Sequence, residues 1–498
     1  MRVLLVYPNL HGMNMLPPSM GIFTGLLRSQ GHEVDLFDTT NWVIPGEEDF
    51  DSDKVKEKNL NARPYDDSIL RSEIRTSDVF EDFRNKVTSF KPQLLAVSST
   101  EDMFPLAIRL LKSVKELNIP VIMGGVFPTF APEICISYDE IDMVCIGEGE
   151  VALSELAMRM EQRQSYDDVE NLWVKKPNGK ITKNPIGRPT DVNSNELIDF
   201  SLFDESRLYR PMQGRTWRML PVETHRGCPY SCTYCNSPSQ RQLYRENGCH
   251  FFRKKSFDKI REELLYYKNG LKAEALYFWA DMFMAYNERE LDEFLDMYSD
   301  IDLPFWCQVR PETIREERIK RLQKAGLFRL GIGVEHGNDE FRRNMLKRRV
   351  TNKTMIENFR ILNKLELPFS VNNIVGFPTE TRELAMDTVE VNRQIDADSY
   401  NIYSYTPFTG TPLRKICEEE GYIEPGTIVE SALKPTLLKM PQFPAHEIEG
   451  IRRTFVLYVK MPRDRWADIR KAEAQTPEAD ALLEQLRVEC RDKYLWSS

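Results

Sequence analysis

Short apolar runs alternate with amphipathic helical patterns along most of this chain, and no other feature constrains the fold as strongly. In residues 1–165, strands are expected at 3–7, 33–37, 94–98, 121–124 and 143–146, and helices at 20–30, 106–116 and 151–162. Strands that alternate with helices predict an α/β fold with a doubly wound, Rossmann-like parallel sheet. The charged stretch 43–89 is longer than a crossover needs, and we interpret it as an insertion of unknown role.

A second series of the same kind occupies residues 218–415. Its strands are expected at 275–279, 305–309, 327–334, 370–375 and 399–405, and its helices at 257–268, 288–298, 315–325, 339–345, 352–362 and 381–395. Repeated β-then-α units of this length predict a full or partial TIM-type parallel barrel. Residues 166–217 are interpreted as a linker with a small hairpin, and residues 416–498 as a mainly helical cap with a helix at 476–494.

Composition narrows the class of protein. A chain of 498 residues with 41% hydrophobic and 29% charged residues is typical of a globular protein with two or three domains. The net charge of −10 argues against sequence-independent binding to nucleic acid. No run approaches the roughly 18–20 apolar residues that span a bilayer. The first apolar run, VLLVYP, is too short for a signal peptide, so a cytoplasmic location is expected.

Turn-forming and polar residues follow four of the first five expected strands. PNLHG follows the first strand, SSTED the third, GGVFPT the fourth and GEGE the fifth. Ligands of open parallel sheets bind beyond the carboxyl ends of the strands. A tight turn explains any one of these segments alone, but four on one edge predict a large ligand. No G-x-G-x-x-G follows the first strand, which disfavours a nicotinamide or flavin dinucleotide.

Three cysteines, Cys228, Cys232 and Cys235, stand in a C-x-x-x-C-x-x-C spacing, whereas the other six are scattered. A structural zinc site needs four ligands, and neither Cys249 nor His250 stands in a ligand-pair spacing. Disulfides do not fit a cytosolic chain. An iron–sulfur cluster held by three thiolates, with one iron open to an exogenous ligand, fits this count best.

The cysteine segment RGCPYSCTYC resembles the signature of the radical S-adenosylmethionine (SAM) enzymes, and later segments agree with it in order. These are YFWADMF, FWCQVRPE, LGIGVEHGND, NIVGFPTET and YTPFTGTPL. The resemblance implies that the three cysteines hold a 4Fe-4S cluster. It implies SAM contacts at Tyr234, Asp281, Gln308, Arg310 and Glu335. His336 stands where the family more often has serine, and its role is left open.

The first domain resembles the cobalamin-binding domain that precedes the barrel in one branch of that family. The matching segments are PPSMGIFTGLLRSQGHEVDLFD, VIMGGVFPTFAPE and DMVCIGEGE. The D-x-H-x-x-G motif that gives cobalt a histidine is absent, so we expect the loop 101–104 to face the lower side of the corrin. The resemblance implies cobalamin contacts at Pro8, Ser99, Thr100, Glu101, Gly124, Gly125, Pro128, Thr129, Gly147 and Glu148.

What the resemblance implies about activity is methylation of an unactivated carbon through a 5′-deoxyadenosyl radical and methylcobalamin, with two SAM consumed per turnover. Tyr403 and Tyr405 are candidates to line the substrate pocket, and a residue in a protein, such as a glutamine of methyl-coenzyme M reductase, is one conceivable substrate. An electron donor such as ferredoxin or flavodoxin is implied. Three alternatives are an oxidative cyclase that uses the same cofactors, a non-catalytic corrinoid carrier, and methylthio insertion. The last needs a second cysteine triad, whereas the first domain has only Cys135 and Cys145.

Overall fold

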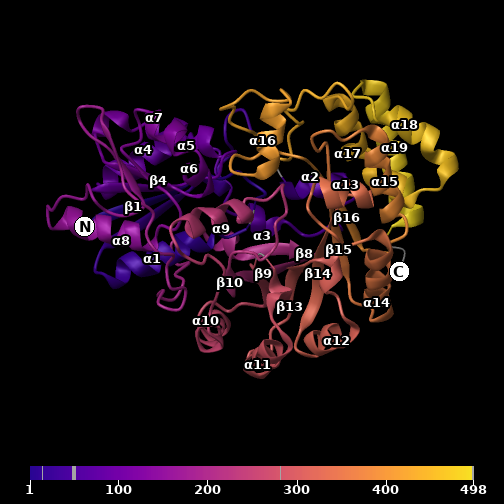
Figure 1. Cartoon of the computed structure of the whole chain (residues 1–498), viewed down its shortest axis with the longest axis horizontal. Coiled ribbons are helices and arrows are strands. Elements are labelled where there is room, and N and C mark those ends of the chain that lie inside the picture. The colour runs from indigo at the N-terminus through magenta and orange to yellow at the C-terminus, as the bar shows by residue number, and fades with distance from the viewer. Residues whose placement is uncertain (14, 48–51, 281, 496–498) are drawn as a thin grey trace.

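The computed structural model describes residues 1–13, 15–47, 52–280 and 282–495 and contains two large sheets. Figure 1 shows the amino-terminal sheet and its helices on one side of the molecule, the second sheet in the middle and the carboxyl-terminal helices on the far side. Each of the two strand-and-helix series expected from the sequence therefore forms a sheet of its own, as predicted.

The first sheet has the strand order β2-β1-β3-β4-β5-β6-β7. Strands β1 (Arg2–Tyr7), β2 (Glu33–Asp38), β3 (Leu94–Ser98), β4 (Val121–Gly124) and β5 (Met143–Cys145) are parallel. Its helices are α1 (Pro18–Ser29), α4 (Val79–Phe90), α5 (Phe104–Lys112), α6 (Val126–Phe130), α7 (Pro132–Ser137) and α8 (Glu150–Glu161). Helices on both faces bury the sheet, so the interior of β1 has no polar position and Val3 to Val6 are fully buried.

The hairpin predicted between the two series exists, as β6 (Leu172–Lys175) and β7 (Ile181–Lys183). It is not a free-standing linker element, because β6 pairs antiparallel with β5 and so extends the first sheet. The limits proposed for the domains at residues 165, 217 and 415 stay predictions.

The second sheet has the order β16-β15-β14-β13-β12-β9-β8. The five predicted strands are β12 (Ala275–Phe278), β13 (Phe305–Val309), β14 (Leu327–Glu335), β15 (Phe369–Val375) and β16 (Ser399–Ser404), all parallel. Seven helices precede or follow these strands: α9 (Ser237–Glu246), α10 (Phe257–Asn269), α11 (Glu288–Tyr298), α12 (Glu316–Lys324), α13 (Asp339–Asn344), α14 (Asn352–Lys364) and α15 (Arg382–Asn392). Because β16 and β8 are the two unpaired edges, the barrel is partial.

Strands β8 (Tyr209–Met212) and β9 (Arg215–Val222) were not predicted from the sequence. They form an antiparallel hairpin whose two turn residues, Gln213 and Gly214, both have positive φ, at 54° and 78°. The segment YRPM contains a proline and lacks an apolar run, which is compatible with a strand only at a sheet edge. A short pair, β10 (His225–Arg226) and β11 (Arg253–Lys254), was also missed.

Residues 52–71 of the insertion lie across the open side of the partial barrel, whereas α4, at its end, packs on the first sheet. The insertion also contains α2 (Ser52–Lys58) and α3 (Ser68–Arg71). At one edge, the Ser399 hydroxyl on β16 donates to the carbonyl of Asn61. Near the other edge, the Thr216 hydroxyl on β9, the strand next to the edge strand β8, donates to the carbonyl of Asp66 at 2.6 Å. A segment without a predicted role therefore connects the two edges of the barrel.

The carboxyl-terminal cap is helical, as expected, with α16 (Pro412–Glu419), α17 (Ala445–Lys460), α18 (Trp466–Ala472) and α19 (Pro477–Tyr494). Arg393, at the end of α15, donates from Nη1 to the carbonyls of Tyr458, Val459 and Met461 and so satisfies the end of α17. None of the helices in the described residues is long and apolar enough to cross a membrane.

Candidate functional site

The three motif cysteines lie on the loop between β10 and α9 and line one cavity of 290 Å³. Arg310 Nη1 lies 3.0 Å from the sulfur of Cys232, and the backbone N–H of Ser237, at the start of α9, points to the sulfur of Cys235 at 3.4 Å. A guanidinium and a helix N-terminus both stabilise negative charge. The loop is therefore suited to thiolates and to an anionic group bound by them.

The donor set decides between a single ion and a cluster. Among the described residues, no three His, Cys, Asp or Glu side chains converge closely enough to hold one metal ion. A cluster in which three separate irons each take one thiolate needs no such convergence, so three sulfurs around one cavity fit it better. Neither Cys249 nor His250 lines this cavity, which leaves the zinc alternative without its fourth ligand there.

Four of the five predicted SAM contacts line the same cavity, namely Tyr234, Gln308, Arg310 and Glu335. The fifth, Asp281, lies outside the described residues. Arg310 stacks 3.8 Å above the ring of Tyr230 and donates from Nε to Glu312 at 2.6 Å, so its guanidinium is fixed in position. The structure thus brings residues from the ends of two strands, β13 and β14, and from the cysteine loop to a single space beside the cysteines.

Arg348 lines this cavity too and was missed by sequence reasoning. It is buried, and it donates to the Tyr234 hydroxyl at 3.0 Å, to the Glu335 carboxylate at 2.8 Å and to the Gly333 carbonyl at 2.8 Å. Burial raises the pKa of Tyr234 well above its usual value, so the phenol stays protonated. Arg348 and Arg349 are adjacent in the segment KRRV, and no spacing distinguishes the buried one from the exposed one.

His336, whose role the family pattern left open, is fully buried and stacks on Phe341 with ring centroids 4.3 Å apart. Its Nδ1 accepts from the backbone N–H of Asn338 at 3.0 Å, so its Nε2 carries the proton and faces Glu380 at 3.1 Å. Glu380 in turn accepts from the backbone N–H groups of Gly376 and Phe377, at 2.6 and 2.8 Å. The contacts of His336 therefore hold the turn after β15 and do not reach the cavity.

A second cavity, of 570 Å³, lies where the carboxyl-terminal edge of the first sheet meets the barrel. Six of the ten predicted cobalamin contacts line it: Ser99, Thr100, Gly124, Gly125, Gly147 and Glu148. The barrel contributes Arg226, Gly227 and Trp279, and the indole of Trp279 is 44% exposed in this space. A large exposed aromatic side chain in a cavity between domains is typical of a surface that a ligand covers. The site therefore fits a large, partly apolar ligand.

At this edge, position 125 requires a glycine. Gly125 has φ of +114°, and a Cβ there would lie 2.5 Å from the carbonyl oxygen of Ser99. The loops after β3 and β4 can approach each other only because this position has no side chain.

The other four predicted cobalamin contacts, Pro8, Glu101, Pro128 and Thr129, do not line the cavity. Pro8 and Pro128 are buried. The Thr129 hydroxyl donates to the Gly125 carbonyl at 2.8 Å and accepts from the Gly147 N–H at 3.0 Å, so it joins two of the loops.

Glu101 connects the first domain to the later part of the chain. Its carboxylate accepts from the backbone N–H groups of Thr409, at 2.7 Å, and Val429, at 3.1 Å, and Arg414 lies 3.7 Å away. Burial raises the pKa of Glu101, and these donors oppose the rise. The contact of Glu101 with the corrin stays a prediction, and the hydrogen bonds of its carboxylate run to the later part of the chain.

Glu148 lines the second cavity, but its carboxylate belongs to an interdomain ion cluster that the sequence did not reveal. It pairs with Arg226 at 3.1 Å and with Arg253, and accepts from the Thr190 N–H at 2.7 Å. Burial alone would raise the pKa of Glu148, but Arg253 and Arg226 hold it below its usual value. The side chain stays ionised and fixes the edge of the first sheet to the cysteine loop.

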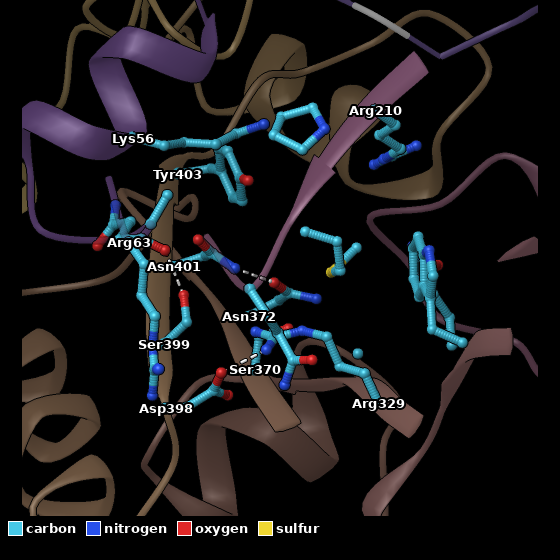
Figure 2. Close-up of a pocket in the computed structure, with 18 of the residues that line it drawn as sticks. Lys56, Arg63, Arg210, Arg329, Ser370, Asn372, Asp398, Ser399, Asn401 and Tyr403 are labelled. Atoms are coloured by element: carbon cyan, nitrogen blue, oxygen red, sulfur yellow. Dashed lines mark hydrogen bonds and ion pairs between the residues drawn. The ribbon is translucent and has the colours of Figure 1, made fainter. Parts of the chain in front are cut away.

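A third cavity, of 480 Å³, runs along the inner face of the barrel and is closed by the insertion (Figure 2). It shares Gln308, Gly331, Glu335 and Asn372 with the cysteine cavity and Met15 with the interdomain cavity. The three spaces are therefore adjacent, with the third reaching both of the others.

The two candidate pocket tyrosines have different positions. Tyr403 lines the third cavity. Tyr405 is buried with its ring 5.2 Å from that of Phe377 and lines none of the three cavities. Strand alternation would place positions 403 and 405 on the same face, but β16 ends at Ser404, so the alternation does not extend to Tyr405.

Comparison with known proteins agrees with this geometry. Residues 222–391 match the family model of the radical SAM superfamily, and residues 60–157 match that of the B12 binding domain. An uncharacterized methyltransferase of Pyrococcus horikoshii is 25% identical over 400 residues, which are 78% of this chain and 83% of the relative. An anaerobic magnesium-protoporphyrin IX monomethyl ester cyclase of Rubrivivax gelatinosus is 25% identical over 415 residues, which are 80% of this chain and 72% of the relative.

A solved structure shares the fold. It is that of the radical SAM methyltransferase TsrM from Kitasatospora setae with tryptophan and a SAM analog bound. It aligns with a TM-score of 0.63 and 15% identity, and the alignment covers 97% of this chain and 89% of that chain. The likeness therefore extends over the first domain, the barrel and the helical carboxyl-terminal part.

Proposed function

This chain belongs to the cobalamin-binding radical SAM enzymes, and we propose that it is a methyltransferase acting on an unactivated carbon. Its cofactors are a 4Fe-4S cluster, SAM and cobalamin. The observation that carries the proposal is the adjacency of the three cavities. A reaction that uses both a radical centre and a methyl donor needs the substrate between them, and the third cavity shares lining residues with both cofactor cavities.

The roles of the side chains in the cysteine cavity follow from their contacts. Cys228, Cys232 and Cys235 would hold the cluster, with Arg310 donating to the Cys232 sulfur and so stabilising the thiolate. Gln308 and Glu335 face the space that SAM would occupy, and Asp281 is retained as a proposed contact. Arg348 fixes the orientation of Glu335 and donates to the Tyr234 hydroxyl, and burial keeps Tyr234 protonated.

When bound, the cluster with SAM supplies a carbon radical that removes a hydrogen atom, and cobalamin supplies a methyl group. The residues of this chain position and shield those groups. Trp279 would cover the corrin from the barrel side, and the backbone at Gly124 and Gly147 would approach it from the first domain. Consumption of two SAM per turnover is part of the proposal.

The test uses anaerobically reconstituted protein with trideuteromethyl-SAM and a reductant. Transfer of the label to cobalamin, detected by mass spectrometry as trideuteromethylcobalamin, is expected even without substrate. A Cys232→Ala variant should lose 5′-deoxyadenosine formation. Formation of 5′-deoxyadenosine without any label on cobalamin or product would refute methyl transfer.

A second candidate function is oxidative cyclisation, favoured by the similarity to the Rubrivivax gelatinosus cyclase. It predicts a product without the label. The four cationic side chains that line the third cavity argue against a tetrapyrrole substrate, because apolar side chains predominate in sites for such molecules. A glutamine side chain of methyl-coenzyme M reductase stays a candidate substrate for methylation.

Further parts of the proposal concern the cellular setting. Ferredoxin or flavodoxin would supply electrons to the cluster. A reducing, cytoplasmic setting is part of the proposal, because thiolates that hold a cluster must stay reduced.

A further inference from the structure

The third cavity concentrates positive charge in a chain that is acidic overall. Six of its lining side chains are charged, four of them cationic (Lys56, Arg63, Arg210 and Arg329) and two anionic (Glu335 and Asp398). Among the lining residues that the structure describes, four positive charges minus two negative charges leave a formal net charge of +2, whereas the whole chain carries −10. Figure 2 shows the four cationic side chains placed around one space.

The partners of these charges are unevenly distributed. Arg329 forms an ion pair with Asp398, and Glu335 forms an ion pair with Arg348 from the adjoining cavity. Both carboxylates of the lining are therefore already matched by an arginine. Of the other three cationic side chains, Arg210 lies on β8, and Lys56 and Arg63 come from the insertion.

Arg210 is held in a way that favours binding of an anion. Its guanidinium carbon lies 4.9 Å from the ring of Tyr277 and 5.3 Å from that of Trp306, which fixes its direction. Within the part of the chain that the structure describes, its Nη1 is shielded from solvent and has no hydrogen-bond partner. A buried donor without an acceptor costs free energy that an anionic ligand would recover.

Part of the neutral lining is polar, beside apolar residues such as Met15, Met212 and Trp306. Ser370 and Asn372 on β15, and Ser399 and Asn401 on β16, line the cavity at alternate positions, whereas their neighbours Val371 and Ile402 face the core. Asn401 Nδ2 donates to Asn372 Oδ1 at 2.9 Å, which orients both amides. These four side chains suit a ligand that carries hydrogen-bonding groups.

We propose that this cavity is the substrate site and that the substrate is a small polar molecule with a carboxylate or phosphate group, bound by Arg210 and Lys56. The volume of 480 Å³ lies in the range of small-molecule sites. The insertion acts as the wall that completes the site, because it supplies Lys56 and Arg63 and connects the two barrel edges. This inference rests on the proposed function, since it names the substrate class of the same site.

The test measures binding without turnover. Holoprotein with cobalamin, cluster and SAM, kept unreduced, is titrated with inorganic phosphate, with acetate and with neutral acetamide at constant ionic strength set by chloride. The melting temperature should rise saturably with phosphate or acetate but not with acetamide. Whichever of the two anions has the lower apparent Kd identifies the group that the substrate carries.

Matched variants locate the effect. Arg210→Met and Lys56→Met should each weaken anion binding at least about tenfold, which is the loss of one hydrogen bond to a charged group. Lys58→Met, on an exposed position of the same helix, should bind as wild type does. If Arg210→Met does not fold, Lys56→Met and Arg63→Met still decide the question, since neither side chain is fully buried.

Two results would overturn the inference. One is that the melting temperature rises with neither anion, or that it rises equally in all variants. The other is methylation of a protein-borne glutamine with unchanged kcat/KM in Lys56→Met. If the label is not transferred in the experiment described above but anions still bind, methyl transfer is refuted and the anion site is retained.

Discussion

Replacing Arg348 by methionine tests whether this buried arginine organises the SAM side of the cysteine cavity. Arg348 is the donor to the Glu335 carboxylate, the Tyr234 hydroxyl and the Gly333 carbonyl, and its side chain is 2% exposed. The Glu335 side chain is 13% exposed, so removal of Arg348 leaves a largely buried carboxylate without its cation. Breaking a buried ion pair in this way costs about 3–5 kcal/mol.

Arg349 supplies the matched control, because it is the neighbouring arginine and is exposed. Arg349→Met should change the free energy of unfolding by no more than about 0.5 kcal/mol. The assay is urea unfolding of the apoprotein at pH 7, followed by circular dichroism, with the same variants then tested for SAM binding. The expected difference between the two variants is about 3 kcal/mol or more.

A third variant separates loss of charge balance from loss of packing. Adding Glu335→Gln to Arg348→Met removes the uncompensated charge, so the double variant should regain at least about 1 kcal/mol relative to Arg348→Met alone. A loss below about 1 kcal/mol in Arg348→Met, or equal losses in Arg348→Met and Arg349→Met, would refute the assigned role.

Three further predictions concern the pH dependence of stability, the contact of Glu101 with the later part of the chain, and the metal content. Burial lowers the pKa of His225 to about 4, so the unfolded chain binds a proton at a higher pH than the folded chain does. Between pH 7 and pH 5, the free energy of unfolding should therefore fall by about 2 kcal/mol more in wild type than in His225→Gln, as measured by urea unfolding. Glu101→Gln places an amide N–H opposite a backbone N–H and should cost about 1–3 kcal/mol, whereas the exposed control Glu116→Gln should not; equal urea midpoints would contradict this. Iron and sulfide analysis of reconstituted protein should give a cluster that Cys232→Ser loses and Cys249→Ser keeps, and zinc in place of iron would contradict the cluster assignment.

The sequence predicted the elements whose pattern is periodic. The five barrel strands and the parallel strands of the first sheet have apolar runs that face a core, and their limits in the structure differ little from those expected. Strand β8 was missed because it lies at an edge, contains Pro211 and has no fully buried position. Local patterns predict burial, and an edge strand has little of it.

The site was predicted where a motif fixes the position of a side chain relative to a backbone turn. The cysteines and Gln308, Arg310 and Glu335 are of this kind, and the structure places them around one cavity. Arg348 could not be predicted, because its partners are more than ten residues away and the adjacent Arg349 has the same local sequence. Contacts between distant segments leave no spacing signal.

The same limit explains why Glu101 was assigned to the corrin. It follows a strand at the ligand edge, as a ligand contact would, but its acceptors are used by Thr409 and Val429, more than 300 residues away. Glu148 also follows such a strand, and its carboxylate binds Arg226 on β10 and Arg253 on β11. Position at the edge alone therefore does not distinguish a ligand contact from a contact between domains.

These two carboxylates have a common consequence for the proposed reaction. Glu101 follows β3 and Glu148 follows β5, so the ligand edge of the first sheet is attached to the rest of the chain at two separated points. Burying a carboxylate is unfavourable unless it is paired and hydrogen-bonded, and both are. Two attachments restrict rotation as well as separation of the domains, whereas one would act as a pivot. A methyl donor held by the first domain and a radical centre held by the barrel can act on the same carbon only if their separation is fixed, and these contacts fix it.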